Sequence, residues 1–272
     1  MSRIAIVGSG ISAMYAVLAC YEKGFYPDVY MRDIAYPKGA IFLRYLPKSL
    51  RTRFPKYDII FDSVGTRKCY IMKQWYNIPK GYRSSFPRTR FVNIGYEPNS
   101  ILYYVFSSKF MMNKISINSN FDDNALFSLG STYDLVFHSF PNSKLKSSLQ
   151  RYIVKLPILT KSIEDVTTQE IIYNGSPESL IVRKSVLFGK EYLELSQRTG
   201  YSDTELRTLF PKYDLSFSQD LDPGTLSMEI PDSTRNLSKK IIAIGRLGRM
   251  ERSELADNTF SLVTRILDEN LK

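Results

Sequence analysis

The chain has 272 residues and a mass of 31.4 kDa, long enough for one large domain or two associated ones. Hydrophobic residues make up 43% of it and charged residues 24%, a balance that excludes a disordered chain. The single histidine, His138, and the two cysteines exclude a multi-histidine metal site and a disulfide framework, so we expect no bound metal.

The charge balance favours an anionic partner. Lys and Arg number 37 against 27 Asp and Glu, a formal net charge of +10. Phosphates, a nucleotide, a nucleic acid or an acidic surface would suit this charge, and a basic protein with no such partner stays open. The sequence shows neither an apolar run of the ~20 residues that a membrane span needs nor a signal-peptide pattern. We therefore expect no membrane partner and a cytoplasmic location.

The first elements in the chain form a βαβ unit. Residues 3–7 are a short apolar run rich in β-branched side chains and predict a strand buried on both faces. Helical spacing of apolar residues predicts a helix over residues 11–23, and Gly24 is a suitable stop. Residues 28–32 predict a second strand, parallel to the first.

The remaining segments are less regular, and residues 34–95 show little periodicity. Further helices are predicted over residues 98–109, 202–210 and 253–271, and strands over residues 114–118, 133–137, 171–173, 180–184, 185–188 and 240–244. Ser202 and Glu205 have the spacing of a capping box. Both ends of the chain thus predict α/β sheet, and the middle predicts a mixed insertion.

We therefore expect an α/β fold with two interleaved domains. The first is a Rossmann-like nucleotide-binding domain built from residues 1–45, 96–148 and 235–272. The second is a mixed α+β cap or substrate domain built from residues 46–95 and 149–234.

The loop between the first strand and helix has the G-x-G-x-x-A pattern of dinucleotide-binding proteins. Gly8 permits a tight turn, Gly10 lets the backbone approach a pyrophosphate, and Ala13 lets the helix pack close to the sheet. The N–H groups that open the helix, at Ile11 and Ser12, would face the phosphates. An unrelated glycine turn is the alternative.

An acidic residue follows at the expected distance. Asp33 lies 20 residues after Ala13, at the end of the second predicted strand. A carboxylate in this position accepts hydrogen bonds from the ribose of an adenine dinucleotide. Strand, glycines, helix, strand and acid thus occur in the order that dinucleotide binding requires.

Three segments resemble a known superfamily. Residues 4–13 resemble the start of FAD-dependent oxidoreductases of the glutathione-reductase-like superfamily. Residues 241–247, which end in Gly245, Arg246 and Leu247, resemble the last strand and turn of UDP-galactopyranose mutase and amine-oxidase-like flavoproteins. Residues 133–137 resemble a strand near the cofactor in those proteins.

The resemblance implies FAD, held by Gly8, Gly10, Ile11, Ser12, Ala13, Asp33, Gly245, Arg246 and Leu247, and we expect it to be non-covalent because no histidine or cysteine stands in an obvious attachment position. The resemblance also implies an FAD-dependent oxidoreductase that acts on an amine or amino-acid-like group of a small-molecule or nucleotide-linked substrate. The net charge of +10 leaves nucleic acid open as a partner. The alternatives are a mutase-like isomerase acting on a nucleotide sugar and a flavin-free binding protein.

The chain also departs from that superfamily. Asp33 stands where the superfamily usually has Glu, and Gly39 alone remains of the glycine pair that usually follows it. The mutase is considerably longer, so its substrate site cannot be transferred to this chain. The resemblance therefore predicts the cofactor and leaves the substrate open.

Catalytic candidates are few. His138 follows the strand over residues 133–137, and it is a candidate general acid or base or, alternatively, a packed core residue. Arg183 is a candidate anchor for an anionic substrate or, alternatively, a solvated arginine in a hairpin. Aromatic and basic residues alternate at Trp75, Tyr76, Tyr82, Arg83, Arg88 and Arg90, a mixture that suits a stacked base with phosphate contacts, a flavin cage or a cap-domain core.

Overall fold

The computed structural model describes residues 2–37, 41–74, 86–107, 115–116, 123–139, 153–164, 166, 168–196, 201–221, 236–238, 240–244 and 258–271. The chain divides into two compact units, each built from segments distant in sequence. Unit 1 comprises residues 1–37, 98–151 and 228–272. Unit 2 comprises residues 38–97 and 152–227.

Unit 1 is built on a six-stranded sheet in the order β12-β13-β6-β1-β2-β5. All neighbouring strands are parallel except β12, which is antiparallel to β13. The strands are β1 (Ile4–Val7), β2 (Asp28–Tyr30), β5 (Ile115–Ser116), β6 (Leu135–His138), β12 (Asn236–Ser238) and β13 (Ile241–Ala243). The carboxyl ends of the five parallel strands therefore share one edge, which is where α/β sheets bind ligands.

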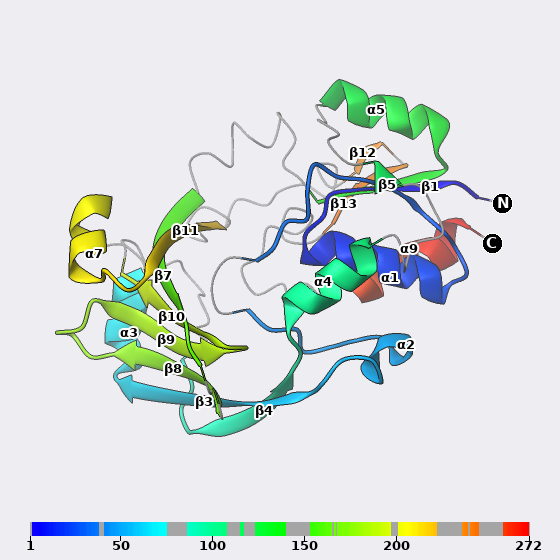
Figure 1. Ribbon diagram of the computed structural model, residues 1–272. Coiled ribbons are helices and arrows are strands. Elements are labelled where there is room, and N and C mark those ends of the chain that lie inside the picture. Colours follow the sequence, from blue (N-terminus) through cyan, green and yellow to red (C-terminus); the bar gives the residue numbers. More distant parts are fainter. Residues whose placement is uncertain are drawn as a thin grey trace. The chain divides into compact units, whose positions relative to one another are not determined.

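Helices cover both faces of this sheet (Figure 1). Helix α1 (Ile11–Glu22) packs against α4 (Pro98–Phe106) and α9 (Asn258–Asn270). Helix α5 (Asp123–Thr132) contacts β6 and β13, and its Leu126 joins a core cluster with Ala5 and Val136. The parallel sheet with helices on both faces is the Rossmann-like architecture that the two ends of the sequence predict.

The predicted opening strand and helix are confirmed. All four residues of β1 are buried, as expected of an apolar β-branched run in a parallel sheet. Every residue of α1 from Ala13 to Cys20 is also buried, because the helix lies between the sheet and two other helices. Burial raises the pKa of the Cys20 thiol well above its ordinary value, so Cys20 acts as a small apolar core residue.

The amino edge of the sheet is closed by a tyrosine–carboxylate network. The Tyr133 hydroxyl donates to Asp28 Oδ2 at 2.7 Å, and its oxygen lies 2.6 Å from the Tyr30 hydroxyl oxygen. The Arg3 guanidinium lies over the Tyr133 ring, 4.8 Å from its centroid. Burial, then the hydrogen bonds with Tyr30 and Asp28, raise the pKa of Tyr133. This edge is therefore internally satisfied and structural.

Unit 2 contains a seven-stranded sheet in the order β11-β7-β10-β9-β8-β3-β4. Its neighbours are antiparallel except for β3 and β8, which pair in parallel although about 100 residues separate them in sequence. The strands are β3 (Tyr57–Gly65), β4 (Phe91–Gly95), β7 (Ile153–Ser162), β8 (Gln169–Gly175), β9 (Ile181–Leu187), β10 (Lys190–Leu195) and β11 (Asp214–Leu221). This mixed sheet is the second domain that the sequence predicts.

Two apolar clusters hold short helices against this sheet. Helix α3 (Arg67–Gln74) packs Tyr70 onto a cluster that includes Ile59 and Ile171. Helix α7 (Asp203–Leu209) packs Leu206 onto a second cluster toward β7, β10 and β11. The predicted capping box of α7 is present, since the Ser202 side chain accepts from the Glu205 N–H and the Glu205 carboxylate accepts from the Ser202 N–H.

The paired strands β3 and β8 approach each other closely where they end, and this approach requires glycine on both strands. Gly65 has φ +76°, and a Cβ there would lie 2.4 Å from the Gly175 carbonyl carbon. A Cβ on Gly175 would lie 2.0 Å from the Thr66 carbonyl oxygen. The Thr66 N–H donates to the Gly175 carbonyl at 3.1 Å at this end of the pair. Only glycine therefore fits where these strands end.

The structure corrects several expectations. Residues 38–45 belong to unit 2 rather than to the first domain, because Leu43 and Tyr96 exchange two backbone hydrogen bonds of 2.9 and 3.0 Å. Strand β2 ends at Tyr30 rather than at residue 32, and a bend follows it. Residues 180–188, predicted as two short strands, contain one strand, β9.

Candidate cofactor site

The glycine loop lies at the carboxyl edge of the parallel sheet. Gly8 has φ +131°, and its N–H donates to the Tyr30 carbonyl at 2.9 Å. A Cβ on Gly8 would lie 2.0 Å from Ser139 Oγ, and the Ser139 N–H in turn donates to the Val7 carbonyl at 3.0 Å. Strand ends β1, β2 and β6 thus meet at Gly8, where the positive φ requires glycine and a side chain would in addition have to displace the Ser139 hydroxyl.

Gly10 is the N-cap of α1 and performs a different role. Its φ of −85° is open to any residue, and a Cβ there would have no heavy atom within 4 Å. The freedom of glycine is therefore not needed for the conformation of the protein itself. The open space beside Gly10 is instead where a ligand would approach the backbone, as the sequence predicts.

The N-terminus of α1 has the properties of an anion site. No side chain caps Gly10, and the first turn contains no acidic residue. The first hydrogen bond of the helix runs from the Met14 N–H to the Gly10 carbonyl at 2.9 Å. The N–H groups of Ile11, Ser12 and Ala13 therefore have no partner within the helix, and the helix dipole adds partial positive charge at the same place.

A hydrogen bond joins the glycine loop to the segment that follows β2. Ser9 is buried, and its Oγ accepts from the Ala35 N–H at 3.2 Å. Asp33 lies within this segment, and its side chain is 69% exposed, 3.9 Å from Arg32 Nε. The predicted ribose acceptor thus occupies a bend that is attached to the predicted phosphate loop. Sequence reasoning did not identify Ser9 as the connecting residue.

Strand β13 brings the C-terminal part of the chain to the same edge. Ala243 pairs with His138 in parallel register, and the Ile244 N–H donates to the His138 carbonyl at 2.9 Å. The next three predicted cofactor residues, Gly245, Arg246 and Leu247, lie outside the described residues. Their proximity to the glycine loop stays a prediction, and the direction of β13 supports it.

His138 is the last residue of β6 and has no exposed surface. It lies between β1 and β13, paired with Val7 on one side and Ala243 on the other. A general acid or base must reach the proton that it transfers. This location therefore favours the packed core interpretation over the catalytic one.

Arg183 forms an ion pair with a carboxylate of unit 2. Its guanidinium forms an ion pair with Glu194, which is 7% exposed, and lies 5.9 Å from the Tyr173 ring centroid. Burial opposes the charged form, but the Glu194 carboxylate and Tyr173 outweigh it and raise the pKa of Arg183. This partner favours a structural role over substrate binding.

A buried lysine that the sequence analysis did not identify lies beside this region. Lys73 is 8% exposed and donates to the carbonyl oxygens of Asn174 and Ile181 at 3.2 and 3.1 Å. Burial lowers its pKa. Ser196 Oγ donates to the Lys73 carbonyl at 2.7 Å, so helix α3, β8 and the end of β10 are connected here. No motif indicates this lysine, because its partners are backbone atoms of distant strands.

Only two residues of the predicted aromatic and basic cluster are among the described residues. Trp75, Tyr76, Tyr82 and Arg83 lie outside the described residues. Arg88 and Arg90 are exposed before β4. The three interpretations of this cluster therefore stay predictions.

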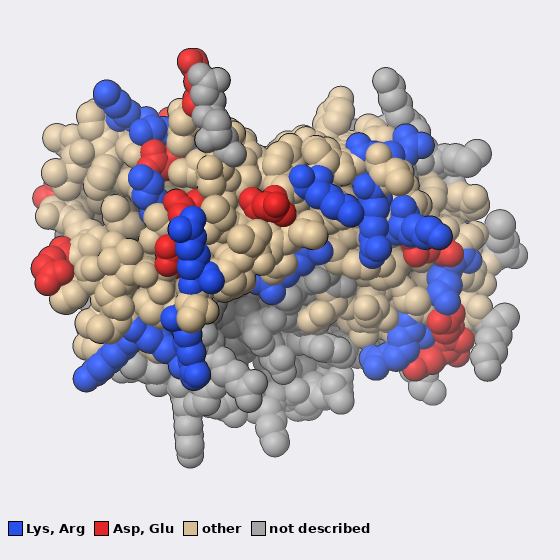
Figure 2. Space-filling model, turned by 90° about the horizontal axis from the view of Figure 1, so that it is seen from below, with Lys and Arg blue, Asp and Glu red and all other residues tan. Residues whose placement is uncertain are grey.

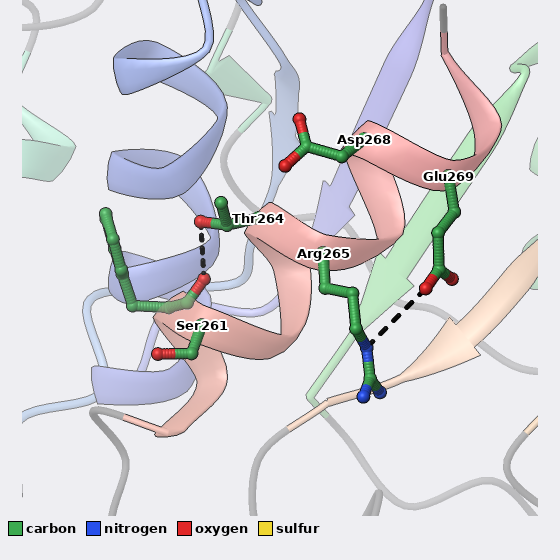
Figure 3. Close-up of a pocket in the computed structure, with 6 residues that line it drawn as sticks. Ser261, Thr264, Arg265, Asp268 and Glu269 are labelled. Atoms are coloured by element: carbon green, nitrogen blue, oxygen red, sulfur yellow. Dashed lines mark hydrogen bonds and ion pairs between the residues drawn. The ribbon is translucent and has the colours of Figure 1, made fainter.

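A groove on the surface of α9 is a weaker candidate site. It is lined by Phe260, Ser261, Thr264, Arg265, Asp268 and Glu269, all from one helix (Figure 3). Its charged groups are paired within the protein: Arg265 Nε lies 3.9 Å from Glu269 Oε1, and Asp268 Oδ1 lies 2.6 Å from Lys23 Nζ. These pairings within the protein make the groove a weaker candidate than the glycine loop.

The described residues provide neither a metal cluster nor a membrane span. No group of three or more His, Cys, Asp or Glu side chains among them is placed to hold a metal ion. None of the described helices is both long and apolar enough to cross a bilayer.

Comparison with known proteins gives the fold and not a close relative. No protein-family model matches the sequence, and no curated protein is significantly similar to it. The structure is similar to that of NikD, an unusual amino acid oxidase essential for nikkomycin biosynthesis, with a TM-score of 0.52 and 10% identity over 100% of this chain and 95% of that chain. It is also similar to a flavin-dependent halogenase from Xanthomonas campestris, with a TM-score of 0.51 and 11% identity over 100% of this chain and 71% of that chain.

At this level of identity the likeness concerns the fold. The predicted fold class, a Rossmann-like α/β domain combined with a mixed second domain, is confirmed. The narrower resemblance to UDP-galactopyranose mutase stays a prediction.

Proposed function

We propose that this chain is an FAD-dependent oxidoreductase in which unit 1 binds FAD and unit 2 is the cap or substrate domain. The observation that carries the proposal is the glycine loop at the carboxyl edge of the parallel sheet, which is hydrogen-bonded to the segment that contains Asp33 through Ser9 and Ala35. The loop has a positive-φ glycine turn and an uncapped helix N-terminus, and Asp33 adds an exposed carboxylate, in the sequence order that an adenine dinucleotide requires. The fold shared with the flavin-dependent halogenase supports a flavin cofactor.

The residues at this edge fit the cofactor. The N–H groups of Ile11, Ser12 and Ala13 would hold the pyrophosphate, and the open space at Gly10 leaves room for it. Asp33 would accept from the ribose hydroxyls. Bound FAD supplies the hydride acceptor, so the chain needs to provide binding, orientation and exclusion of water.

Non-covalent binding is the form that the residues support. The sequence contains one histidine and two cysteines, and covalent flavin attachment commonly needs one of these side chains to be accessible. His138 and Cys20 are fully buried within unit 1. Cys69 lies in the first turn of α3, where its N–H donates to the Thr66 hydroxyl at 3.3 Å. It belongs to unit 2 and not to the unit that is proposed to bind FAD.

For the substrate we propose an amine or amino-acid-like group on a small or nucleotide-linked molecule. The resemblance to amine-oxidase-like flavoproteins supports this class, as does the similarity to a structure named as an amino acid oxidase. Arg183 and His138 are engaged in the protein interior, so neither is assigned a catalytic role. The reaction would then depend on how the cap presents the substrate to the cofactor.

The test uses a graded series at Gly10. The free protein accommodates a side chain there, so Gly10→Ala and Gly10→Val should melt within a few degrees of the wild type. We expect FAD affinity, measured by flavin fluorescence quenching during titration, to fall at least about tenfold for Gly10→Ala and further for Gly10→Val. An unchanged affinity in Gly10→Val would contradict the proposed phosphate site.

Activity distinguishes the two alternatives. Anaerobic addition of candidate amines should bleach the flavin absorbance of the reconstituted protein. Turnover of a nucleotide sugar that requires prior reduction, with no net electron transfer, would indicate the mutase-like isomerase instead. A purified protein that binds no FAD at any concentration would indicate a flavin-free binding protein.

A further inference from the structure

A basic surface in unit 2 has no role in the proposed cofactor site. Between Asp33 and Asp58 the sequence contains no acidic residue. Within that stretch, residues 44–56 carry five cations, which we call the basic segment: Arg44, Lys48, Arg51, Arg53 and Lys56. All five are exposed, and the short helix α2 (Lys48–Arg51) lies at the centre of the segment.

The basic segment is held in place by its apolar residues. Leu43, Leu46 and Leu50 are buried, with exposed fractions of 3% or less. Leu43 also pairs with Tyr96 through two backbone hydrogen bonds. Because the leucines anchor the segment from inside, the backbone that carries the cations is already ordered. Binding a partner therefore costs little conformational entropy of the backbone.

Two of its arginines are also oriented by contacts with neighbouring groups. Arg51 Nε donates to the Leu46 carbonyl at 2.6 Å, and its guanidinium carbon lies 5.2 Å from the Tyr45 ring centroid. The Arg44 guanidinium carbon lies 5.6 Å from the Phe42 ring centroid. A guanidinium held over a ring keeps its remaining donors for a ligand, and such donors match phosphate oxygens in pairs.

Four of the five cations of the basic segment form no ion pair with a described residue. Among the described residues, the ion pairs formed within 4.0 Å involve none of Arg44, Lys48, Arg51 and Lys56. Cations elsewhere in unit 2 behave differently, since Lys161 and Lys184 both bind Glu191. Figure 2 shows Lys and Arg side chains close together on the side of the molecule where α2 lies.

We propose that the basic segment is a docking surface for the phosphate backbone of a nucleic acid. Exposed cations, three of them arginines, supply the contacts that sequence-independent backbone binding uses. A membrane surface fits less well, because a helix that inserts at a bilayer needs an exposed apolar face. The leucines of α2 and its flanks are instead turned into the protein. The proposal is independent of the proposed FAD site, which lies in unit 1.

The test measures binding of the full-length chain to a labelled DNA single strand of about 16 nucleotides by fluorescence anisotropy. Affinity should fall steeply between roughly 50 and 200 mM salt. The triple variant Arg44→Gln/Lys48→Gln/Lys56→Gln leaves the structural contact of Arg51 intact. We expect it to bind at least about tenfold more weakly, with a salt slope smaller by roughly 2, because each lost phosphate contact to a single strand lowers the slope by about 0.7.

A matched variant separates this surface from the net charge. Lys190→Gln/Arg207→Gln/Lys212→Gln removes three exposed cations of the same unit outside the basic segment and should retain nearly wild-type affinity. Equal weakening by both triple variants would overturn the proposal. So would binding to phosphatidylserine vesicles or to polyglutamate without binding to DNA. Gly10→Val should bind DNA like the wild type, so failure of the FAD proposal would be distinguishable from failure of this one.

Discussion

The two units differ in whether their polar groups find partners inside the protein. In the unit of the seven-stranded sheet, Arg183 forms an ion pair with Glu194, and two lysines, Lys161 and Lys184, form ion pairs with Glu191. Buried Lys73 donates hydrogen bonds to two backbone carbonyl oxygens. At the carboxyl edge of the six-stranded sheet, the first N–H groups of α1 have no partner within the helix. The difference indicates where to look for function: polar groups with partners inside the protein support the fold, and the carboxyl edge of a parallel sheet is where α/β proteins bind ligands.

The largest effect should come from breaking the Arg183–Glu194 pair. Glu194→Leu leaves the Arg183 cation largely buried without its carboxylate, so we expect a loss of about 3 kcal/mol in unfolding free energy. The double variant Arg183→Leu/Glu194→Leu should recover much of that loss. Urea unfolding measures both. If Arg183 anchored a substrate instead, Arg183→Lys would raise KM while stability stayed at the wild-type level.

A smaller loss is expected at Gly8. Gly8→Ala places a side chain in the left-handed region and against Ser139 Oγ, which should lower the unfolding free energy by about 2 kcal/mol. Adding Ser139→Gly should remove the steric part only. Gly10→Ala is the matched control at the same loop, since its Cβ meets no atom. Equal destabilisation by Gly8→Ala and Gly10→Ala would contradict the division of roles between the two glycines.

At Asp33 the effect should fall on binding alone. The side chain is exposed, so Asp33→Asn should leave the melting temperature unchanged. Loss of a charged acceptor for the ribose should weaken FAD binding about tenfold, or about 1.4 kcal/mol. Asp58→Asn, at an exposed carboxylate in unit 2, should leave FAD affinity unchanged. Equal FAD affinities of Asp33→Asn and Asp58→Asn in a fluorescence titration would contradict a role of Asp33 in binding the ribose.

The smallest effect should be a pH dependence at Glu191. Burial opposes its ionisation, but Lys184 and Lys161 outweigh that and lower the pKa of Glu191 below the ordinary 4.5. The unfolded state therefore takes up a proton first, and stability falls as pH decreases below about 4.5. We expect a contribution under about 1 kcal/mol, because both lysines are partly exposed. Unfolding curves of Glu191→Gln and the wild type should converge at acid pH, and parallel curves would contradict this assignment.

Local signals in the sequence predicted unit 1 better than unit 2. The β1–α1–β2 unit lies within 30 residues, and each part carries its own signal: an apolar run, a glycine loop and helical spacing. The α7 capping box is equally local, with both partners three residues apart. In unit 2, β3 pairs with β8 across about 100 residues, and no short pattern reports such a pairing.

The same limit applies to single residues. Gly8, Gly10 and Asp33 were predicted because their roles follow from backbone conformation and spacing near one turn. Arg183 was open to a substrate role until the fold placed Glu194 beside it on the neighbouring strand.

The amino-acid sequence by itself thus determined the glycine loop after the first strand, the capped helix and the excess of positive charge, because these depend on residues close together in the chain or on composition. Only the tertiary structure decided which charges are neutralised, since an ion pair depends on strands that meet in space. It neutralised Arg183 and Lys184 within the second sheet and left the cations around α2 facing outward.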